Sequence, residues 1–312
     1  MIHVEKLTKF YGSFCAVDSI NLDVKKGEIT GLLGPNGAGK TTTLRMLTGY
    51  LEPTSGIIRI KDSSFEDNEL AVKKLIGYLP ESAPLYHGML VYDYLGFIAK
   101  VRGLDSKKAA ARIHRLAGLC GLNDIMHKPI GELSKGLKQR VGLAHAMMDD
   151  PEILILDEPT SGLDPNQIVE IRDIIRSFGQ EKTIILSTHI LSEAEATCDR
   201  IVIIDKGKIA ADGSTESLKK STGEEKTVFV TLVNADYAAA AAALVTVEGV
   251  TAVEEIETPA AGYLRLKISA VSGQDIMQRI YAKIRETSWI MVEFTQETKS
   301  LENIFRELTK EA

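Results

Sequence analysis

Short apolar runs punctuate the first two thirds of the chain, and each run ends at a glycine or a polar residue. This spacing is typical of buried strands in an α/β domain. The run at 153–156 holds four consecutive aliphatic residues, which favours a central parallel strand covered on both faces. The pattern predicts strands over four segments: 29–33, 153–157, 183–188 and 201–205.

Other segments show different periods. Residues 1 to about 30 alternate between apolar and polar side chains, which predicts an antiparallel strand pair, and Gly27-Glu28 predicts a turn before the strand at 29–33. From about 82 to 150 helical spacing dominates, as in Ala109–Leu119 and Arg140–Met148. Near residue 205, the segment Asp205–Lys208 predicts a hairpin turn.

The composition changes at Lys219–Lys226, a polar segment that contains a glycine and predicts a linker. We therefore expect domains at 1–220 and 221–312. The second is predicted to follow the β-α-β-β-α-β order of a ferredoxin-like α+β sandwich, with an amphipathic helix over Ser300–Leu308. It shows no catalytic constellation, which favours a regulatory or dimer-stabilising role. Its expected elements are strands at 227–233, 250–256, 263–268 and 290–294, and helices at 235–244 and 274–286.

The segment Gly34–Thr41 has the sequence of a phosphate-binding loop, and it lies between an apolar strand and a helix. Its glycines let consecutive backbone N–H groups point inward, and the start of the helix adds positive potential. Lys40 would reach the β- and γ-phosphates, and the Thr41 hydroxyl would ligate Mg²⁺. A glycine-rich turn without a ligand is the alternative, but the complete motif in this context predicts ATP or GTP binding.

A second motif places two carboxylates, Asp157 and Glu158, at the end of an apolar strand. Alone, such a pair is more often a solvated turn. Together with Lys40 it predicts hydrolysis, in which Asp157 holds the hydration shell of Mg²⁺ and Glu158 orients or deprotonates the attacking water.

Three further segments stand around these motifs, at Leu133–Arg140, Ser161–Asp164 and Ser187–His189. In order and spacing they resemble the signature motif, D-loop and switch histidine of the ATP-binding-cassette (ABC) ATPases. The resemblance covers about residues 1 to 215. It implies a P-loop NTPase core with an antiparallel β subdomain and a helical subdomain inserted at about 82–150.

The same resemblance assigns roles to individual residues. Tyr11 resembles the aromatic that stacks on adenine, although an aromatic at a strand end can also fill a core. Ser134 and Gly136 resemble groups that reach the γ-phosphate of the other subunit's ATP, and Ser134 is also a good helix cap. His189 resembles the γ-phosphate switch, where the alternative is a polar loop residue. The nucleotide-binding loop comprises Gly34, Pro35, Asn36, Gly37, Ala38, Gly39, Lys40, Thr41 and Thr42.

Two features depart from the common family pattern. Lys135 and Leu137 replace the third and fifth members of the signature motif. Glu81 stands where the family usually has glutamine, and its carboxylate can coordinate Mg²⁺ or a water molecule. Similar substitutions occur in the branch of ABC ATPases that serves polysaccharide, drug and gliding-motility exporters, and the sequence as a whole most resembles that branch.

Composition agrees with a globular ATPase of 312 residues, with 44% hydrophobic and 26% charged residues. From the residues at the start and the lack of an apolar run of membrane-spanning length, we expect neither a signal peptide nor a membrane-spanning helix. A net charge of −6, negative on both sides of residue 225, predicts no nucleic-acid partner. The three cysteines predict reduced thiols in a cytoplasm.

Taken together, the resemblance implies a cytoplasmic ATPase, peripheral at the inner face of the cell membrane. It would use MgATP to drive export, as a homodimer, through a separate transmembrane permease. The apolar segment Pro84–Tyr92 is the expected docking region, with core packing as an equal explanation. Alternatives are a soluble ABC-type machine acting on ribosomes or DNA, and a nucleotide-dependent binding switch. The single phosphate loop and the short interval between Lys40 and Asp157 disfavour the first, and Glu158 with His189 disfavours the second.

Overall fold

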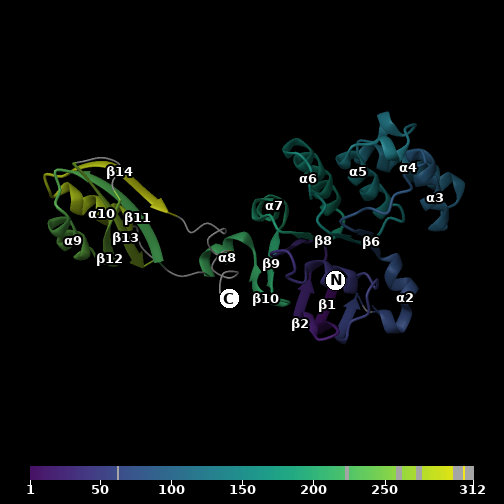
Figure 1. Cartoon of the computed structure of the whole chain (residues 1–312), viewed down its shortest axis with the longest axis horizontal. Helices are drawn as coiled ribbons and strands as arrows, with labels where there is room; N and C mark the ends of the chain where they lie inside the picture. The colour runs from purple at the N-terminus through teal and green to yellow at the C-terminus, as the bar shows by residue number, and fades with distance from the viewer. Residues whose placement is uncertain (62, 222–224, 258–261, 272–275, 298–304, 306–312) are drawn as a thin grey trace. The chain divides into compact units, whose positions relative to one another are not determined.

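The computed structural model describes residues 1–61, 63–221, 225–257, 262–271, 276–297 and 305. Contacts divide the chain into two compact units, Met1–Thr215 and Glu216–Glu307. Figure 1 shows the elements of each unit. Among the described residues, no helix is both long and apolar enough to span a membrane.

A six-stranded, mostly parallel sheet forms the centre of the first unit. Three of its strands, β3, β7 and β8, are buried at every position, as expected for parallel strands covered on both faces. All neighbouring pairs are parallel except β9 and β10, which form an antiparallel hairpin. In spatial order the strands are β10 (Lys208–Gly213), β9 (Arg200–Asp205), β3 (Ile29–Leu33), β8 (Thr183–Thr188), β7 (Ile153–Leu156) and β6 (Ile76–Leu79).

An antiparallel sheet supplies the other β layer of this unit. The predicted N-terminal strand pair is confirmed, since β1 (Ile2–Tyr11) pairs antiparallel with β2 (Phe14–Val24). On the other side of β1 lie β4 (Ser55–Ile60) and the short β5 (Ser63–Ser64). Their buried aliphatic side chains join those of the central sheet in one core.

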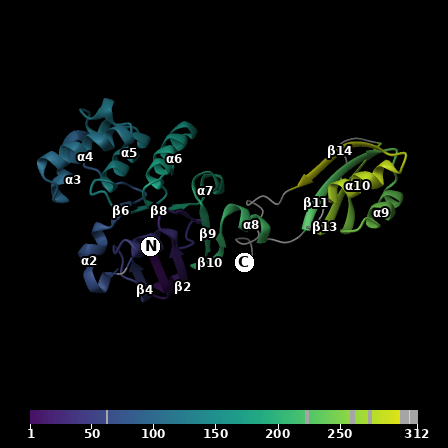
Figure 2. The same ribbon diagram turned by 180° about the vertical axis from the view of Figure 1, so that it is seen from behind.

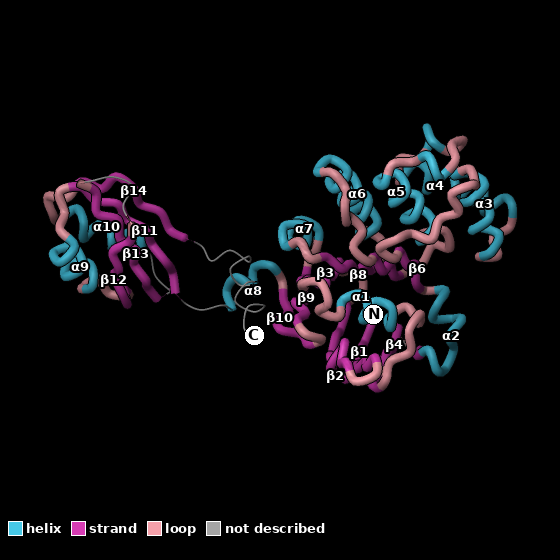
Figure 3. The backbone as a smooth tube through the Cα atoms, viewed as in Figure 1, coloured by secondary structure: helices cyan, strands magenta, loops and turns pink. Residues whose placement is uncertain are grey.

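Helices flank the central sheet, and α1 and α2 also contact strands of the antiparallel sheet (Figures 2 and 3). The expected helical subdomain contains α3, α4 and α5, which pack against one another. Helix α5 approaches β6 closely at Gly77, where an added Cβ would lie 2.1 Å from the Ala146 carbonyl oxygen. The helices of this unit are α1 (Lys40–Leu47), α2 (Phe65–Lys74), α3 (Val91–Val101), α4 (Ser106–Leu119), α5 (Lys135–Ala146), α6 (Pro165–Gly179) and α7 (Leu191–Thr197).

The second unit is an antiparallel sheet covered by helices on one face. Its chain order is β-α-β-β-α-β and its strand order is β12-β13-β11-β14, so the predicted ferredoxin-like sandwich is confirmed. Alternate residues of β11 and β13 point toward the helices and form the core. The elements are α8 (Thr215–Ser221), β11 (Glu225–Val233), α9 (Tyr237–Val245), β12 (Val250–Ile256), β13 (Tyr263–Val271), α10 (Ile276–Arg285) and β14 (Ile290–Glu297).

Two expected segments meet the limits of the described residues. The linker expected at 219–226 is regular at both ends, because α8 runs to Ser221 and β11 begins at Glu225. Residues 222–224 lie outside the described part of the chain. The helix expected over Ser300–Leu308 also lies outside it, apart from Phe305.

Candidate active site

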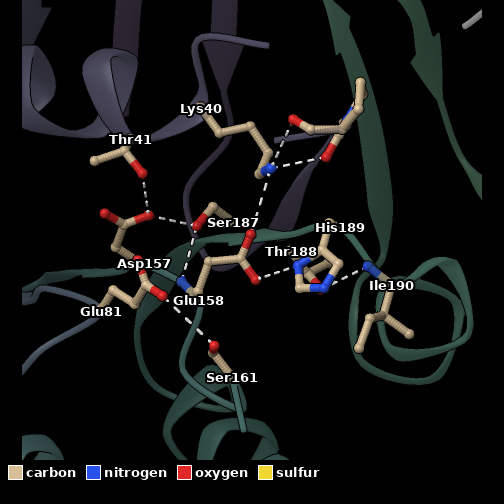
Figure 4. Close-up of polar contacts among 12 residues, drawn as sticks. Lys40, Thr41, Glu81, Asp157, Glu158, Ser161, Ser187, Thr188, His189 and Ile190 are labelled. Atoms are coloured by element: carbon tan, nitrogen blue, oxygen red, sulfur yellow. Dashed lines mark hydrogen bonds and ion pairs between the residues drawn. The ribbon is translucent and has the colours of Figure 1, made fainter. Parts of the chain in front are cut away.

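Three neighbouring strands deliver the predicted catalytic side chains to one edge of the central sheet. Strand β3 continues into the loop before α1, β7 ends just before Asp157, and β8 ends just before His189. Because these strands are parallel and adjacent, their carboxyl ends meet at the same edge. Figure 4 shows the resulting cluster of polar contacts.

The predicted phosphate loop is shaped by glycines at its tightest points. Gly37 and Gly39 have φ of 82° and 105°, which side chains rarely adopt. An added Cβ at Gly39 would also lie 2.5 Å from the Ala16 carbonyl oxygen. The Lys40 ammonium folds back over the loop and donates to the carbonyl oxygens of Gly34 (2.7 Å) and Pro35 (3.2 Å). The loop therefore places a fixed positive charge beside backbone N–H groups at a helix start, as an anion site requires.

Asp157 is buried and accepts two hydroxyl donors on one oxygen. Its Oδ1 accepts from Thr41 at 3.0 Å and from Ser187 at 2.7 Å. These bonds connect the start of α1 with the ends of β7 and β8. The neighbouring Tyr78 stays neutral, because burial raises the pKa of its hydroxyl and the Asp157 charge raises it further.

Glu158 has an unusual backbone and two charged neighbours. Its φ is 47°, in the left-handed region, and its N–H donates to Ser187 Oγ at 2.9 Å. One carboxylate oxygen lies 3.3 Å from Lys40 Nζ, and the other lies 2.9 Å from His189 Nδ1. The Lys40 and Glu158 side chains are only 6% and 9% exposed, so they form a buried ion pair. The His189 ring is 43% exposed and forms the outer side of the cluster.

A cavity of about 330 Å³ opens beside this cluster. Tyr11 lines it with 46% of its surface exposed, so this ring does not fill a core as the alternative interpretation supposed. Glu81 also lines it, and its carboxylate accepts a long 3.5 Å hydrogen bond from Ser161. The complete lining is Tyr11, Phe14, Ala16, Asn36, Gly37, Gly39, Lys40, Thr41, Thr42, Glu81, Glu158, Ser161 and His189.

Ser134 and Gly136 do not line this cavity. Ser134 caps α5 and accepts a 3.3 Å hydrogen bond from the N–H of Leu137, so the predicted capping role is confirmed. Gly136 is buried against Gln167. The Lys135 ammonium reaches the turn at Gly162, where an added Cβ would lie 2.4 Å from it. The start of α5, which carries Ser134 and Gly136, therefore lies outside the cavity lined by Tyr11 and His189.

The oxygen atoms at Thr41 and Asp157 suit a hard cation such as Mg²⁺. Among the described residues, no group of three or more His, Cys, Asp or Glu side chains is arranged to hold a metal alone. Mg²⁺ typically uses one or two carboxylates and completes its shell with waters and substrate phosphates. The donor set at this site therefore fits a metal that arrives with its nucleotide.

Sequence reasoning did not assign roles to several residues of the site. Ser187 joins Asp157 to the Glu158 backbone, although it had appeared only as part of the motif at 187–189. Thr160 and Thr188 both donate to Glu193 in α7. The sequence signals for Ser187 were its place in that motif and at the end of an apolar run, and no signal marked Glu193.

Comparison with known proteins finds relatives that are described as transport or ABC transporter ATP-binding proteins. A family profile described as ABC transporter matches residues 17–161. The bacitracin transport ATP-binding protein BcrA of Bacillus licheniformis is 43% identical over 222 residues, covering 70% of this chain and 72% of the relative. The uncharacterized ABC transporter ATP-binding protein YhaQ of Bacillus subtilis is 33% identical over 308 residues, covering 98% of both chains. The second alignment therefore includes the C-terminal unit.

A solved structure supports the fold of the first unit. This is cbiO1 from Clostridium perfringens, described as part of the ABC transporter complex cbiONQ. It has a TM-score of 0.65 and 29% sequence identity, and the match covers 70% of this chain and 90% of that one.

Proposed function

The chain belongs to the ATP-binding proteins of ABC transporters, which hydrolyse ATP, and we propose that its hydrolytic site is the cavity between Tyr11 and His189. We further propose that two copies act together beneath a separate transmembrane permease, at the inner face of the cell membrane. The observation that carries the site is that Lys40, from the loop after β3, meets Asp157 and Glu158, which follow β7: Thr41 bonds Asp157, and Lys40 pairs with Glu158 at the cavity.

Nucleotide binding is assigned to the loop, its helix and Tyr11. The N–H groups of the loop and the start of α1 would hold the β- and γ-phosphates, with Lys40 as the fixed cation. The Lys40 ammonium already donates to the Gly34 and Pro35 carbonyl oxygens, and these bonds fix the position of its otherwise flexible side chain. The exposed ring of Tyr11 offers a face for adenine.

Thr41 and Asp157 would hold Mg²⁺, and Glu81 would contact it or a bound water. When bound, the ion neutralises charge that develops on the phosphate oxygens. Ser187 orients Asp157 by donating to Oδ1, so the bond leaves Oδ2 available to face the metal. The carboxylate is thus held in one rotamer before any ligand arrives.

Glu158 is assigned as the group that accepts a proton from the attacking water. Its carboxylate lies between the Lys40 ammonium and the His189 ring, so both oxygens are fixed in direction. His189 Nδ1 contacts Glu158, and its exposed edge would face the γ-phosphate. This division gives binding to Lys40, Thr41 and Asp157, and water activation to Glu158.

The Glu158→Gln substitution tests this division. We expect ATP hydrolysis to fall by about 10²–10⁴-fold, because a carboxamide does not take up the proton. ATP affinity should be retained, and MgATP should then accumulate a dimer on size-exclusion chromatography. Lys40→Ala is the matched control, because it should lose ATP binding itself. An unchanged hydrolysis rate in Glu158→Gln would remove Glu158 from the catalytic role.

The permease is proposed to dock at a groove beside α3 and α5. This groove has a volume of about 560 Å³, and Arg45, Lys73 and Arg102 line it without a carboxylate among the lining residues. Tyr86, two positions after the lining residue Pro84, and Tyr92 near the start of α3 are 55% and 54% exposed. A permease segment with acidic side chains and an apolar face would match these features, and the permease would select the transported cargo.

A further inference from the structure

Glu193 connects the two segments that carry the proposed water-activating pair. It lies in the first turn of α7, and its Oε2 accepts hydroxyl hydrogen bonds from Thr160 at 2.6 Å and Thr188 at 3.2 Å. Thr160 is two positions after Glu158, and Thr188 immediately precedes His189. One carboxylate oxygen therefore bridges the chain just beyond β7 and the end of β8.

The contacts also fix the backbone around the histidine. The Thr188 hydroxyl donates to Glu193. It also accepts from the N–H of Ile190 at 3.0 Å, the contact drawn in Figure 4. The Thr188 hydroxyl therefore fixes the backbone on the far side of His189, at Ile190, and is itself held by Glu193. On the other segment, Thr160 is 8% exposed, so its hydroxyl has little access to bulk water as a substitute partner.

We propose that Glu193 is a positioning residue for ATP hydrolysis, holding Thr160 and Thr188 so that Glu158 and His189 stay within hydrogen-bonding distance. This inference rests on the proposed function of those two residues. Glu193 does not line the nucleotide cavity. It lines a separate, mainly apolar cavity of about 310 Å³ with Thr160 and Thr188. Glu193 therefore acts through the threonines and touches neither nucleotide nor water at the reacting end.

A simpler role for Glu193 would be to stabilise α7, because an acidic residue in the first turn interacts favourably with the helix dipole. The two roles predict different responses to substitution. Glu193→Asp keeps a charge in the first turn but shortens the side chain by one methylene, so it should lose the threonine contacts. Thr160→Val removes a hydroxyl without changing the helix at all, and Thr160→Ser restores it.

Steady-state hydrolysis by the full-length protein, ATP affinity and thermal unfolding decide between these roles. We expect Glu193→Ala and Glu193→Asp to lower kcat by about 10- to 100-fold, the usual cost of losing an outer positioning contact. ATP affinity should change less than about twofold, because no phosphate contact is removed. Thr160→Val should lower kcat in the same way, Thr160→Ser should restore most of it, and the double variant Thr160→Val with Glu193→Ala should be no worse than either single variant.

Glu195→Ala, a charge-matched change on the same helix, should retain kcat. The inference is overturned if Glu193→Ala or Thr160→Val hydrolyses ATP at the wild-type rate. It is also overturned if Glu193→Asp has normal kcat while Glu193→Ala loses only thermal stability. The Glu158→Gln result separates the two levels of the argument. If Glu158→Gln is inactive and Glu193→Ala is normal, only the positioning role fails, whereas an active Glu158→Gln removes the proposed function itself.

Discussion

Acidification should destabilise the first unit through His145, which lies in α5 and lines the proposed docking groove. Burial lowers the pKa of His145 to about 4, and the nearby Arg102 charge lowers it further. The ring is held by a 2.8 Å hydrogen bond between Nδ1 and the Tyr94 hydroxyl. In the unfolded chain the same imidazole titrates with a pKa of about 6.5. The unfolded state therefore binds the proton more readily than the folded state.

The sign and size of the effect follow from these two values. Between pH 6.5 and pH 4 the unfolded state carries more protons, so the free energy of unfolding falls as the pH decreases. The pKa difference corresponds to a full loss of about 3 kcal/mol below pH 4. At pH 5 about 2 kcal/mol of it is already lost. Above pH 7 this group no longer affects stability.

Urea unfolding at pH 7 and pH 5 measures this contribution. The single tryptophan, Trp289, lies in the second unit, so its fluorescence follows that unit while far-ultraviolet circular dichroism also follows the first. The variant His145→Gln keeps a partner for Tyr94 but does not titrate, and His114→Gln changes an exposed histidine as the matched control.

We expect wild type and His114→Gln to lose about 2 kcal/mol more than His145→Gln in the transition not seen by Trp289. Equal losses in wild type and His145→Gln would show that the folded protein takes up the proton without cost, which would refute the reasoning from burial.

Two further predictions concern partners and the second unit. Tyr86→Glu with Tyr92→Glu should prevent co-purification with the permease and retain ATP binding, whereas Val245→Glu, an equally exposed site in the second unit, should co-purify normally; retained co-purification of the tyrosine variant would place docking elsewhere. Truncation after Lys220 should leave the ATP affinity of dilute protein nearly unchanged in calorimetric titration, because all proposed nucleotide contacts precede residue 190. A folded 1–220 fragment that fails to bind ATP when dilute would contradict this; coupling to dimerisation is measured separately at high concentration.

The sequence predicted those parts of the molecule that depend on local pattern. The phosphate loop is a contiguous motif, and the apolar runs before Asp157 and His189 have the length and composition of buried parallel strands, which the structure confirms. The ferredoxin-like fold of the second unit was predicted from the order in which segments with strand periodicity and helix periodicity follow one another. In these cases the information lies within a few neighbouring residues, where strand and helix periods are set.

Contacts between distant side chains could not be predicted in this way. Thr160 and Glu193 are separated by 33 positions, and their hydrogen bond depends on how α7 packs after β8. Glutamate in the first turn of a helix is common, so residue type and spacing gave no reason to single out Glu193. The same holds for Ser187, whose hydroxyl serves two acidic neighbours only because β7 and β8 are adjacent.

The left-handed backbone at Glu158 has a consequence for the evolution of this protein. A non-glycine residue in this region costs about 1–3 kcal/mol, and the fold retains it here through contacts to Ser187, Lys40 and His189. A glycine at this position would remove that cost together with the carboxylate. Because the carboxylate also pairs with the buried Lys40 ammonium, its loss would leave that charge without its partner, which costs more than the strain relieved. Selection for heat resistance alone should therefore retain Glu158 and not enrich Glu158→Gly. The contacts that hold this strained backbone in place are thus the same ones that orient the carboxylate proposed to activate water.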